Sequence, residues 1–261
     1  MRRTTKTTCL LALARGLAFT LVAGFGLAAC GGGDGVDIAS GQEADPVVVD
    51  IPIAYVKRPI PAADVPLVPV SGATNLLAIE PGAKLYVRDL ASPSGVEENI
   101  TGGRWGDLAD IKDLSVSFDG TLLLFAMRAP IFPGMDDIDI ESWNIWEYEF
   151  ATGALRRVID DEDLAGSGHD RFPQYLPDGR IVFSSTRQVK TAEILVDEGR
   201  GQFTLFEETR TEPAFVLHVM NGDGTDIHQI SFNPSHDLSP TVMSNGQIVF
   251  ARWDQALGYD E

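Results

Sequence analysis

Cysteine is nearly absent from this chain. Only Cys9 and Cys30 occur among its 261 residues, and Cys9 lies in a segment that we expect to be removed. A single remaining cysteine can form no internal disulfide bond. The stability of the mature chain must therefore come from burial of apolar side chains rather than from cross-links.

Catalytic motifs are also lacking. The sequence contains no Cys-x-x-Cys-His for covalent haem, no Gly-x-Ser-x-Gly nucleophile turn, no His-Glu-x-x-His zinc helix and no glycine-rich phosphate loop. We therefore expect no catalysis by this chain alone and no resident cofactor.

Basic residues are few. Lysine and arginine number 20 against 38 acidic residues, which gives a net charge of −18. Removal of residues 1–29 would take away four basic residues and no acid, leaving 16 basic against 38 acidic residues and a net charge of −22. Such a charge repels phosphate groups, so it argues against nucleic acid as a partner and against direct binding to anionic lipid.

The N-terminal residues have the pattern of a secretory signal. A basic start precedes an apolar run over residues 10–27 that only Arg15 interrupts. The following Leu27-Ala28-Ala29-Cys30 resembles the lipobox of bacterial lipoproteins, and this resemblance implies a lipid on Cys30. We expect residues 1–29 to be a lipoprotein signal peptide and residues 30–45 to be a glycine-rich flexible tether. An ordinary cleaved signal, or an uncleaved anchor in which Cys30 is incidental, is the alternative.

The residue after the cysteine bears on location. It is Gly31 and not an aspartate, so nothing at that position argues for retention in the inner membrane. The expected location is the bacterial cell envelope, with a lipid anchor in the outer membrane and the folded part facing the periplasm.

A turn, a buried strand and an arginine recur three times along the chain. The clearest copy runs from Pro177 to Arg187, and the others lie at 118–128 and 244–252. Asp-Gly or Asn-Gly beside apolar runs is a strong hairpin signal, because glycine adopts the positive φ that a tight turn demands. Residues 53–58 repeat the strand and the arginine without the turn.

Hairpins with alternating apolar residues lie between these copies, at 85–101, 144–159 and 216–230. Four strands per unit predict an all-β β-propeller over residues 46–261, because one small sheet cannot bury both of its faces alone. We expect about three to three and a half blades, either as a truncated six-bladed ring or as a half-ring that pairs with a second copy. Residues 129–142 and 188–213 are insertions, and the second is expected to add a small hairpin at the rim.

The repeated turns and strands resemble the PD40 repeat of TolB-like β-propellers. Three segments are similar to the propeller domain of hydrazine synthase α-subunits: Tyr55-Val56-Lys57-Arg58-Pro59, Gly168-His169-Asp170-Arg171, and Val219-Met220-Asn221 with Asp226-Ile227-His228-Gln229-Ile230-Ser231. The likeness covers roughly residues 46–254 and implies a propeller fold. The haem attachment motif of that enzyme has no counterpart in this chain.

The sharpest site candidates are two His-Asp pairs. His169-Asp170 and His236-Asp237 stand at the same offset before a turn, at Asp178 and Asn245. In a propeller they would lie at the entry to the innermost strands of neighbouring blades, near the mouth of the central channel. Two imidazoles and two carboxylates that converge there could bind a divalent cation or another ligand. Alternatively, each pair ties its own blade together by hydrogen bonds to the backbone.

Other polar and aromatic residues are expected to be structural. His218 and His228 lie in alternating strands, at the surface or between blades. Of Trp143 and Trp146, one is expected to pack between blades and the other to lie near the rim. The arginines that end the repeated strands are expected to form recurring ion pairs between blades; they are Arg58, Arg128, Arg187 and Arg252.

Together these features predict a binding or scaffolding module. It would be a lipid-anchored propeller that faces the periplasm, presents its channel mouth to a protein, peptide or small ligand, and contacts the membrane through its lipid. The alternative is the propeller part of a larger haem-containing redox enzyme that resembles the hydrazine synthase α-subunit.

Overall fold

The computed structural model describes residues 51–59, 76–91, 95–132, 134–136, 139–201, 204–207, 210 and 212–253. The predicted signal peptide, Cys30 and the tether lie outside the described residues. All of the described residues belong to one compact unit, Val49–Glu261.

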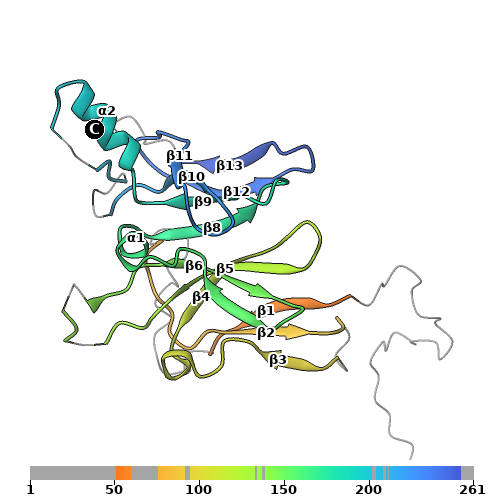
Figure 1. Ribbon diagram of the computed structural model, residues 1–261. Coiled ribbons are helices and arrows are strands. Elements are labelled where there is room, and N and C mark those ends of the chain that lie inside the picture. The colour runs from red at the N-terminus through yellow and green to blue at the C-terminus, as the bar shows by residue number, and fades with distance from the viewer. Residues whose placement is uncertain are drawn as a thin grey trace, which may run out of the picture. The chain divides into compact units, whose positions relative to one another are not determined.

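The described residues form antiparallel sheets, drawn in Figure 1. Blade 1 holds β1 (Ile53–Lys57), β2 (Lys84–Arg88) and β3 (Glu97–Asn99). Blade 2 holds β4 (Asp110–Val116), β5 (Leu122–Arg128), β6 (Asn144–Glu149) and β7 (Ala154–Arg157). Blade 3 holds β8 (Asp170–Tyr175), β9 (Ile181–Ser185), β10 (Val216–Met220) and β11 (His228–Gln229). Blade 4 holds β12 (Asp237–Val242) and β13 (Ile248–Arg252).

Three helical segments of the described residues join these strands. They are a 3₁₀ turn (Arg104–Asp107) between blades 1 and 2, α1 (Glu162–Gly166) between blades 2 and 3, and α2 (Val189–Asp197) inside blade 3. Within the described residues, no helix is both long and apolar enough to cross a membrane.

The turn chemistry produces the blades as the sequence predicts. Each complete sheet has its strands in chain order, β4-β5-β6-β7 and β8-β9-β10-β11. Gly179 holds φ at +86° in the turn between β8 and β9, and the Asp178 carboxylate accepts the Arg180 N–H at 3.2 Å. Such a turn brings the two strands back side by side. The predicted all-β class of four-stranded propeller blades is confirmed, while the number of blades in the complete protein stays a prediction.

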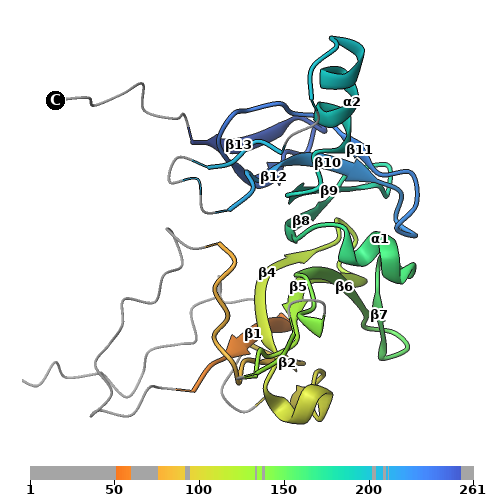
Figure 2. The same cartoon turned by 90° about the vertical axis from the view of Figure 1, so that its left-hand side faces the viewer.

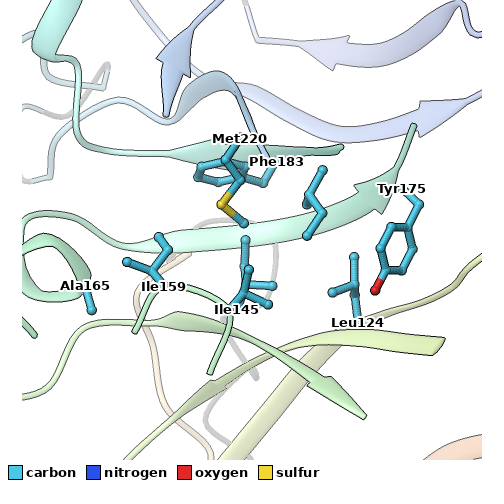
Figure 3. Packing of buried hydrophobic residues seen from close by; sticks show 9 residues of the cluster. Leu124, Ile145, Ile159, Ala165, Tyr175, Phe183 and Met220 are labelled. Carbon is cyan, nitrogen blue, oxygen red and sulfur yellow. The ribbon is translucent and has the colours of Figure 1, made fainter. Parts of the chain in front are cut away.

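Apolar side chains between neighbouring blades form the core. β9 shows the principle, because Ile181 and Phe183 pack toward blade 2 and the intervening Val182 packs toward blade 4. Figure 3 shows the cluster between blades 2 and 3, with Phe183 and Met220 above Ile145 and Leu124. Full burial of one such side chain contributes about 1.5–3 kcal/mol. The first strands β4, β8 and β12 also contact one another in sequence, as expected for sheets repeated about an axis.

The first strands of blades 2, 3 and 4 carry a β-bulge that the sequence did not reveal. The pairing register shifts within β4, β8 and β12, and a residue other than glycine takes a positive φ at each shift. These residues are Asp113 (φ 60°), Phe172 (φ 56°) and Ser239 (φ 51°). A bulge bends its strand and increases the local twist, which aims the start of the strand away from its own sheet.

The second insertion forms an element that its prediction did not include, the helix α2. In the described part of the return segment, an antiparallel bridge joins Phe206 to Pro213, and backbone hydrogen bonds from Glu207 to Glu212 and from Ala214 to Leu205 flank it, as in a small hairpin. The apolar residues Ile194, Leu195 and Val196 are consecutive, which does not fit the alternation of a half-buried strand. The helix buries Leu195 and ends at Asp197. Gly199, just beyond this end, has a φ of +70°, which allows the Arg200 N–H to reach the Leu195 carbonyl at 2.8 Å.

Candidate functional site

The two predicted His-Asp pairs occupy equivalent positions. His169 Nδ1 accepts the backbone N–H of Trp143 at 3.1 Å, and His236 Nδ1 accepts that of Phe215 at 3.0 Å. The backbone N–H groups of Asp170 and Asp237 donate to the carbonyls of the same two partners, at 2.8 and 2.7 Å. Each pair is therefore bound to the residue that precedes the third strand of the preceding blade. Each pair also binds its own blade, as the alternative interpretation predicts: the His169 N–H donates to the Thr186 hydroxyl at 3.0 Å, and the His236 carbonyl accepts the Trp253 N–H at 2.8 Å.

The carboxylates of these pairs bind arginines. Asp170 is fully buried and receives Arg187 Nε at 3.1 Å and Nη2 at 2.6 Å, and Asp237 receives Arg252 Nε at 2.8 Å and Nη2 at 3.0 Å. Both ion pairs lie within one blade, so the prediction of pairs between blades is wrong for Arg187 and Arg252. The reason is strand order: the antiparallel second strand returns its end to the start of the first strand.

The remaining two repeat arginines differ. Arg58 does cross between blades, since its Nη1 lies 2.5 Å from Asp110 of β4. Arg128 donates to the carbonyls of Glu141 at 2.6 Å and Leu77 at 3.0 Å. A further pair between blades that the sequence did not indicate joins Arg171 of β8 to Asp113 in the bulge of β4, with Nη2 at 3.1 Å from Oδ1.

The protonation of His169 agrees with a structural role. Burial, with Arg128 and Arg171 nearby, lowers the pKa of His169 to about 4, so its ring is neutral and Nδ1 can accept a hydrogen bond. Among the described residues, no three histidine, cysteine, aspartate or glutamate side chains gather in a way that could hold a metal ion. A divalent cation at His169, Asp170, His236 and Asp237 stays a prediction.

A pocket of about 550 Å³ lies elsewhere, at the edge of blade 3 between α1 and α2. Figure 1 and, from a second side, Figure 2 show α1 and α2 near the ends of β9 and β10. We call this cavity the α1–α2 pocket. The residues that line it are Leu164, Ser167, Arg187, Val189, Lys190, Glu193, His218, Ile227, His228, Gln229 and Phe232. A volume of this size is typical of small-molecule sites.

His218 of β10 is the unusual member of this lining. Its residue is only 2% exposed, and its ring packs against that of Phe183 with centroids 5.6 Å apart. Nδ1 lies 2.9 Å from the Val216 carbonyl oxygen, so Nδ1 carries the proton that it donates there. Nε2 is buried and has no hydrogen-bond partner in the described part of the chain. Burial lowers the pKa of His218 to about 4, which leaves Nε2 as a neutral acceptor.

The charged groups of the α1–α2 pocket are already satisfied. Arg187 binds Asp170 and also donates to the Leu164 carbonyl and the Ser167 hydroxyl. Lys190 pairs with Glu193 at 2.7 Å. The Ser167 hydroxyl itself donates to the Leu164 carbonyl at 2.8 Å, so it is held as a structural group.

Gln188 holds the wall that α2 forms. This side chain is 98% buried and its Nε2 donates to the carbonyls of Ala214 at 2.7 Å and Leu205 at 3.1 Å, while its Oε1 accepts the Leu205 N–H at 3.0 Å. One amide thus joins the start of α2 to the return segment. Thr191 of α2 is in turn bound through its N–H and hydroxyl to the side chain of Gln229 in β11.

The sequence predicts His218 between blades or at the surface and does not indicate it as a binding residue. The available signal was its strand position, because His218 pairs directly with the core residue Phe183 and stands two residues before buried Met220. His228, by contrast, is exposed and forms a 2.8 Å contact with Asp226. Trp143 is fully buried, with Arg171 of the next blade over its ring at 4.8 Å, whereas Trp146 is only partly buried.

The sheets define the chain as an all-β protein of the propeller class. No family model matches it, and no curated protein does. Solved structures that it resembles include a putative TolB from Agrobacterium tumefaciens. The two are 18% identical with a TM-score of 0.43, and the match covers 67% of this chain and 47% of that one. TolB from Acinetobacter baumannii is 16% identical, with a TM-score of 0.41, and the match covers 67% of this chain and 33% of that one. Hydrazine synthase from Kuenenia stuttgartiensis is 15% identical, with a TM-score of 0.49, and the match covers 77% of this chain and 27% of that one.

The chain spans about half of the first of these proteins and about a third and a quarter of the other two. At such identities and TM-scores the likeness concerns the fold, and the fold assignment itself is based on the sheets described above.

Proposed function

We propose that this chain is a binding module whose ligand enters the α1–α2 pocket. The observation that carries the proposal is the unpartnered Nε2 of His218, a residue that is 98% buried and belongs to the lining of the pocket. A buried polar atom left without a hydrogen bond costs about 1–3 kcal/mol. A ligand that donates to Nε2 would remove that cost.

Binding fits the pocket better than catalysis does. The groups with the strongest chemistry, Arg187, Ser167 and Lys190, all have partners within the protein. Nucleophilic catalysis would need a hydroxyl or thiol next to a free base, and the Ser167 hydroxyl is bound to Arg187 and Leu164 instead. The blades then serve as the rigid support for the site.

We further propose that the module works at a membrane surface. The lipobox-like Leu27-Ala28-Ala29-Cys30 and the acidic composition of the rest of the chain support a lipid-anchored body that faces the periplasm and contacts the membrane only through its lipid. A protein or peptide at the channel mouth, as the sequence predicts, would be a second use of the same scaffold.

The binding proposal can be tested by filling the pocket. Phenol, indole and toluene would be added in turn to the full-length chain in detergent, with binding followed by saturation-transfer NMR. We expect at least one probe to bind the native chain and to fail with Val189→Trp, which places an indole at the pocket wall. Val196→Trp is the matched control, because Val196 is half exposed on the same helix and does not line the pocket.

Two outcomes would contradict this function. Either none of the three probes binds to the native chain, or they bind to Val189→Trp as well as they bind to Val196→Trp.

A further inference from the structure

The imidazole of His218, in the lining of the α1–α2 pocket, has a fixed polarity. The Val216 carbonyl takes the proton of His218 Nδ1 at 2.9 Å, so the ring cannot turn its N–H toward the pocket without losing that bond. The ring also stays neutral, since burial lowers the pKa of His218 to about 4. At neutral pH the pocket therefore offers a lone pair and demands a hydrogen-bond donor.

The pocket offers nothing that would stabilise a charged ligand. Both positive groups in its lining are paired: the Arg187 side chain is 97% buried against the fully buried carboxylate of Asp170, and Lys190 pairs with Glu193. An anionic ligand would place its charge against the lone pair of Nε2. A cationic ligand would lose its hydration without gaining an unpaired carboxylate, and that loss is costly.

Four further residues of the lining are apolar. Leu164, Val189, Ile227 and Phe232 contribute hydrophobic surface from α1, α2 and the loops that flank β11, and Phe183 packs directly behind the imidazole. Walls of this kind favour flat, hydrophobic rings, which bury area and lose little conformational freedom. About 550 Å³ accommodates one or two such rings.

We infer that the ligand of the α1–α2 pocket is an uncharged small aromatic molecule that carries one hydroxyl or N–H group, and that this group donates to Nε2 of His218. Phenols and indoles are the simplest members of this class. The inference builds on the proposed function, because it names the ligand chemistry of the same pocket. It also assigns His218 as the residue that determines specificity.

The test compares probes that differ only in the donor. Phenol is paired with anisole, and indole with 1-methylindole, because methylation removes the donor and keeps the ring. Dissociation constants are measured by calorimetry on the full-length chain in detergent. We expect each donor probe to bind about tenfold more tightly than its methylated partner, the effect of one hydrogen bond to a buried acceptor.

The variant His218→Phe separates this inference from the proposed function. Phenylalanine keeps the stacking on Phe183 and removes the acceptor, so the methylated probes should bind about as well as before while the tenfold preference for the donor disappears. Thermal unfolding of the variant checks that it folds. In the native chain, the ¹⁵N resonance of His218 Nε2 should move when phenol is added and stay in place when anisole is added.

Each outcome decides a different claim. If anisole and phenol bind the native chain equally, or if the preference survives in His218→Phe, the donor inference fails and the pocket remains a binding site. If no probe of either kind binds to the native chain, the proposed function fails and the donor inference fails with it.

Discussion

Three buried or nearly buried histidines use the same ring in two ways. His169 and His236 accept a backbone N–H at Nδ1, which makes them ties between blades. His218 donates from Nδ1 to a carbonyl and leaves Nε2 without a partner. The tautomer that the neighbouring backbone selects therefore decides which histidine is structural and which is available to a ligand.

The buried ion pair of Asp170 and Arg187 gives the first residue-scale prediction. Arg187→Gln should lower the free energy of unfolding by about 3–5 kcal/mol, because it leaves a buried carboxylate without its partner. Arg180→Gln breaks the Arg180–Asp178 pair, in which both side chains are about half exposed, and should cost less than about 1 kcal/mol. Urea unfolding of both variants gives the comparison, and equal losses would contradict it.

The low pKa of His169 gives the second prediction, which concerns how stability depends on pH. In the unfolded chain a histidine binds a proton near its ordinary pKa of 6.5, whereas folded His169 binds one only near pH 4. The unfolded state therefore takes up protons first, and stability falls as the pH is lowered from about 7 to 4, by roughly 3 kcal/mol for this residue.

His169→Gln tests this pH dependence. Glutamine has a side-chain carbonyl that can accept the Trp143 N–H but does not titrate, so the variant should lose less stability between pH 7 and pH 4 than the native chain does. Denaturant midpoints at several pH values provide the measurement. Parallel curves for the two proteins would show that the histidine is not held in its neutral form.

At this scale the sequence predicted only part of the site. The spacing of the two His-Asp pairs indicated repeated positions, and the structure places both in equivalent contacts. Which nitrogen of each ring meets which backbone group depends on the approach of the neighbouring blade, and residue spacing does not contain that information. The same holds for His218, whose role depends on α1 and α2 closing a pocket over it.

At the scale of elements, contacts between turns of neighbouring blades restrict the turn residues. Gly224, in the turn between β10 and β11, has φ of +84°, and a Cβ there would stand 2.2 Å from the Val158 carbonyl oxygen of blade 2. Gly179 has nearly the same φ, +86°, but a Cβ there would meet no atom within 4 Å. The two glycines thus differ in their surroundings and not in their backbone conformation.

Alanine at these two glycines gives the third prediction. Gly179→Ala should cost about 1–2 kcal/mol, the strain of a side chain in the left-handed region. Gly224→Ala should cost about 1–3 kcal/mol more, because it also forces two blades apart. Thermal unfolding measures both, and a smaller loss at Gly224 than at Gly179 would contradict the close approach of the blades.

Strands and turns were predictable where the same sequence pattern repeats along the chain, and elements that occur once were not. The Asp-Gly turns and the alternating hairpins recur, so they specified the four-stranded blades. The bulges at Asp113, Phe172 and Ser239 left no trace, because three unrelated residue types adopt the same positive φ there. The helix α2 was missed because its run of apolar residues fits a short buried strand as well as a helix.

For the whole molecule, the blades are linked in a chain of specific polar contacts. Arg58 joins blade 1 to blade 2, Arg171 and His169 join blade 3 to blade 2, and His236 joins blade 4 to blade 3. Apolar clusters fill the same three interfaces. Since each blade completes the burial of its neighbour, we expect these blades to unfold together.

The predicted lipid anchor gives the fourth prediction. In a bacterial host that is fed an alkyne-labelled palmitate, the native chain should incorporate the label and sediment with membranes. Cys30→Ala should abolish both, because the thiol is the site of lipid attachment. Cys9→Ala is the control and should behave like the native chain, since Cys9 lies within the predicted signal peptide. Label retained in Cys30→Ala would contradict the anchor.

The alternative assignment, a propeller within a larger haem-containing redox enzyme, stays a prediction. The present chain holds the blades and no Cys-x-x-Cys-His sequence. A haem attached through a Cys-x-x-Cys-His motif would therefore have to be held elsewhere in such a protein.

The attachment of α2 has a consequence for how such modules diversify. Gln188 closes the base of the insertion with three hydrogen bonds, and the strands on either side pair with each other directly. Everything between the two ends of that closure could be exchanged for a different sequence without altering the sheet register. A related protein could thus acquire a new ligand by replacing this insertion of about two dozen residues, while the hydrogen-bond acceptor His218 stays unchanged.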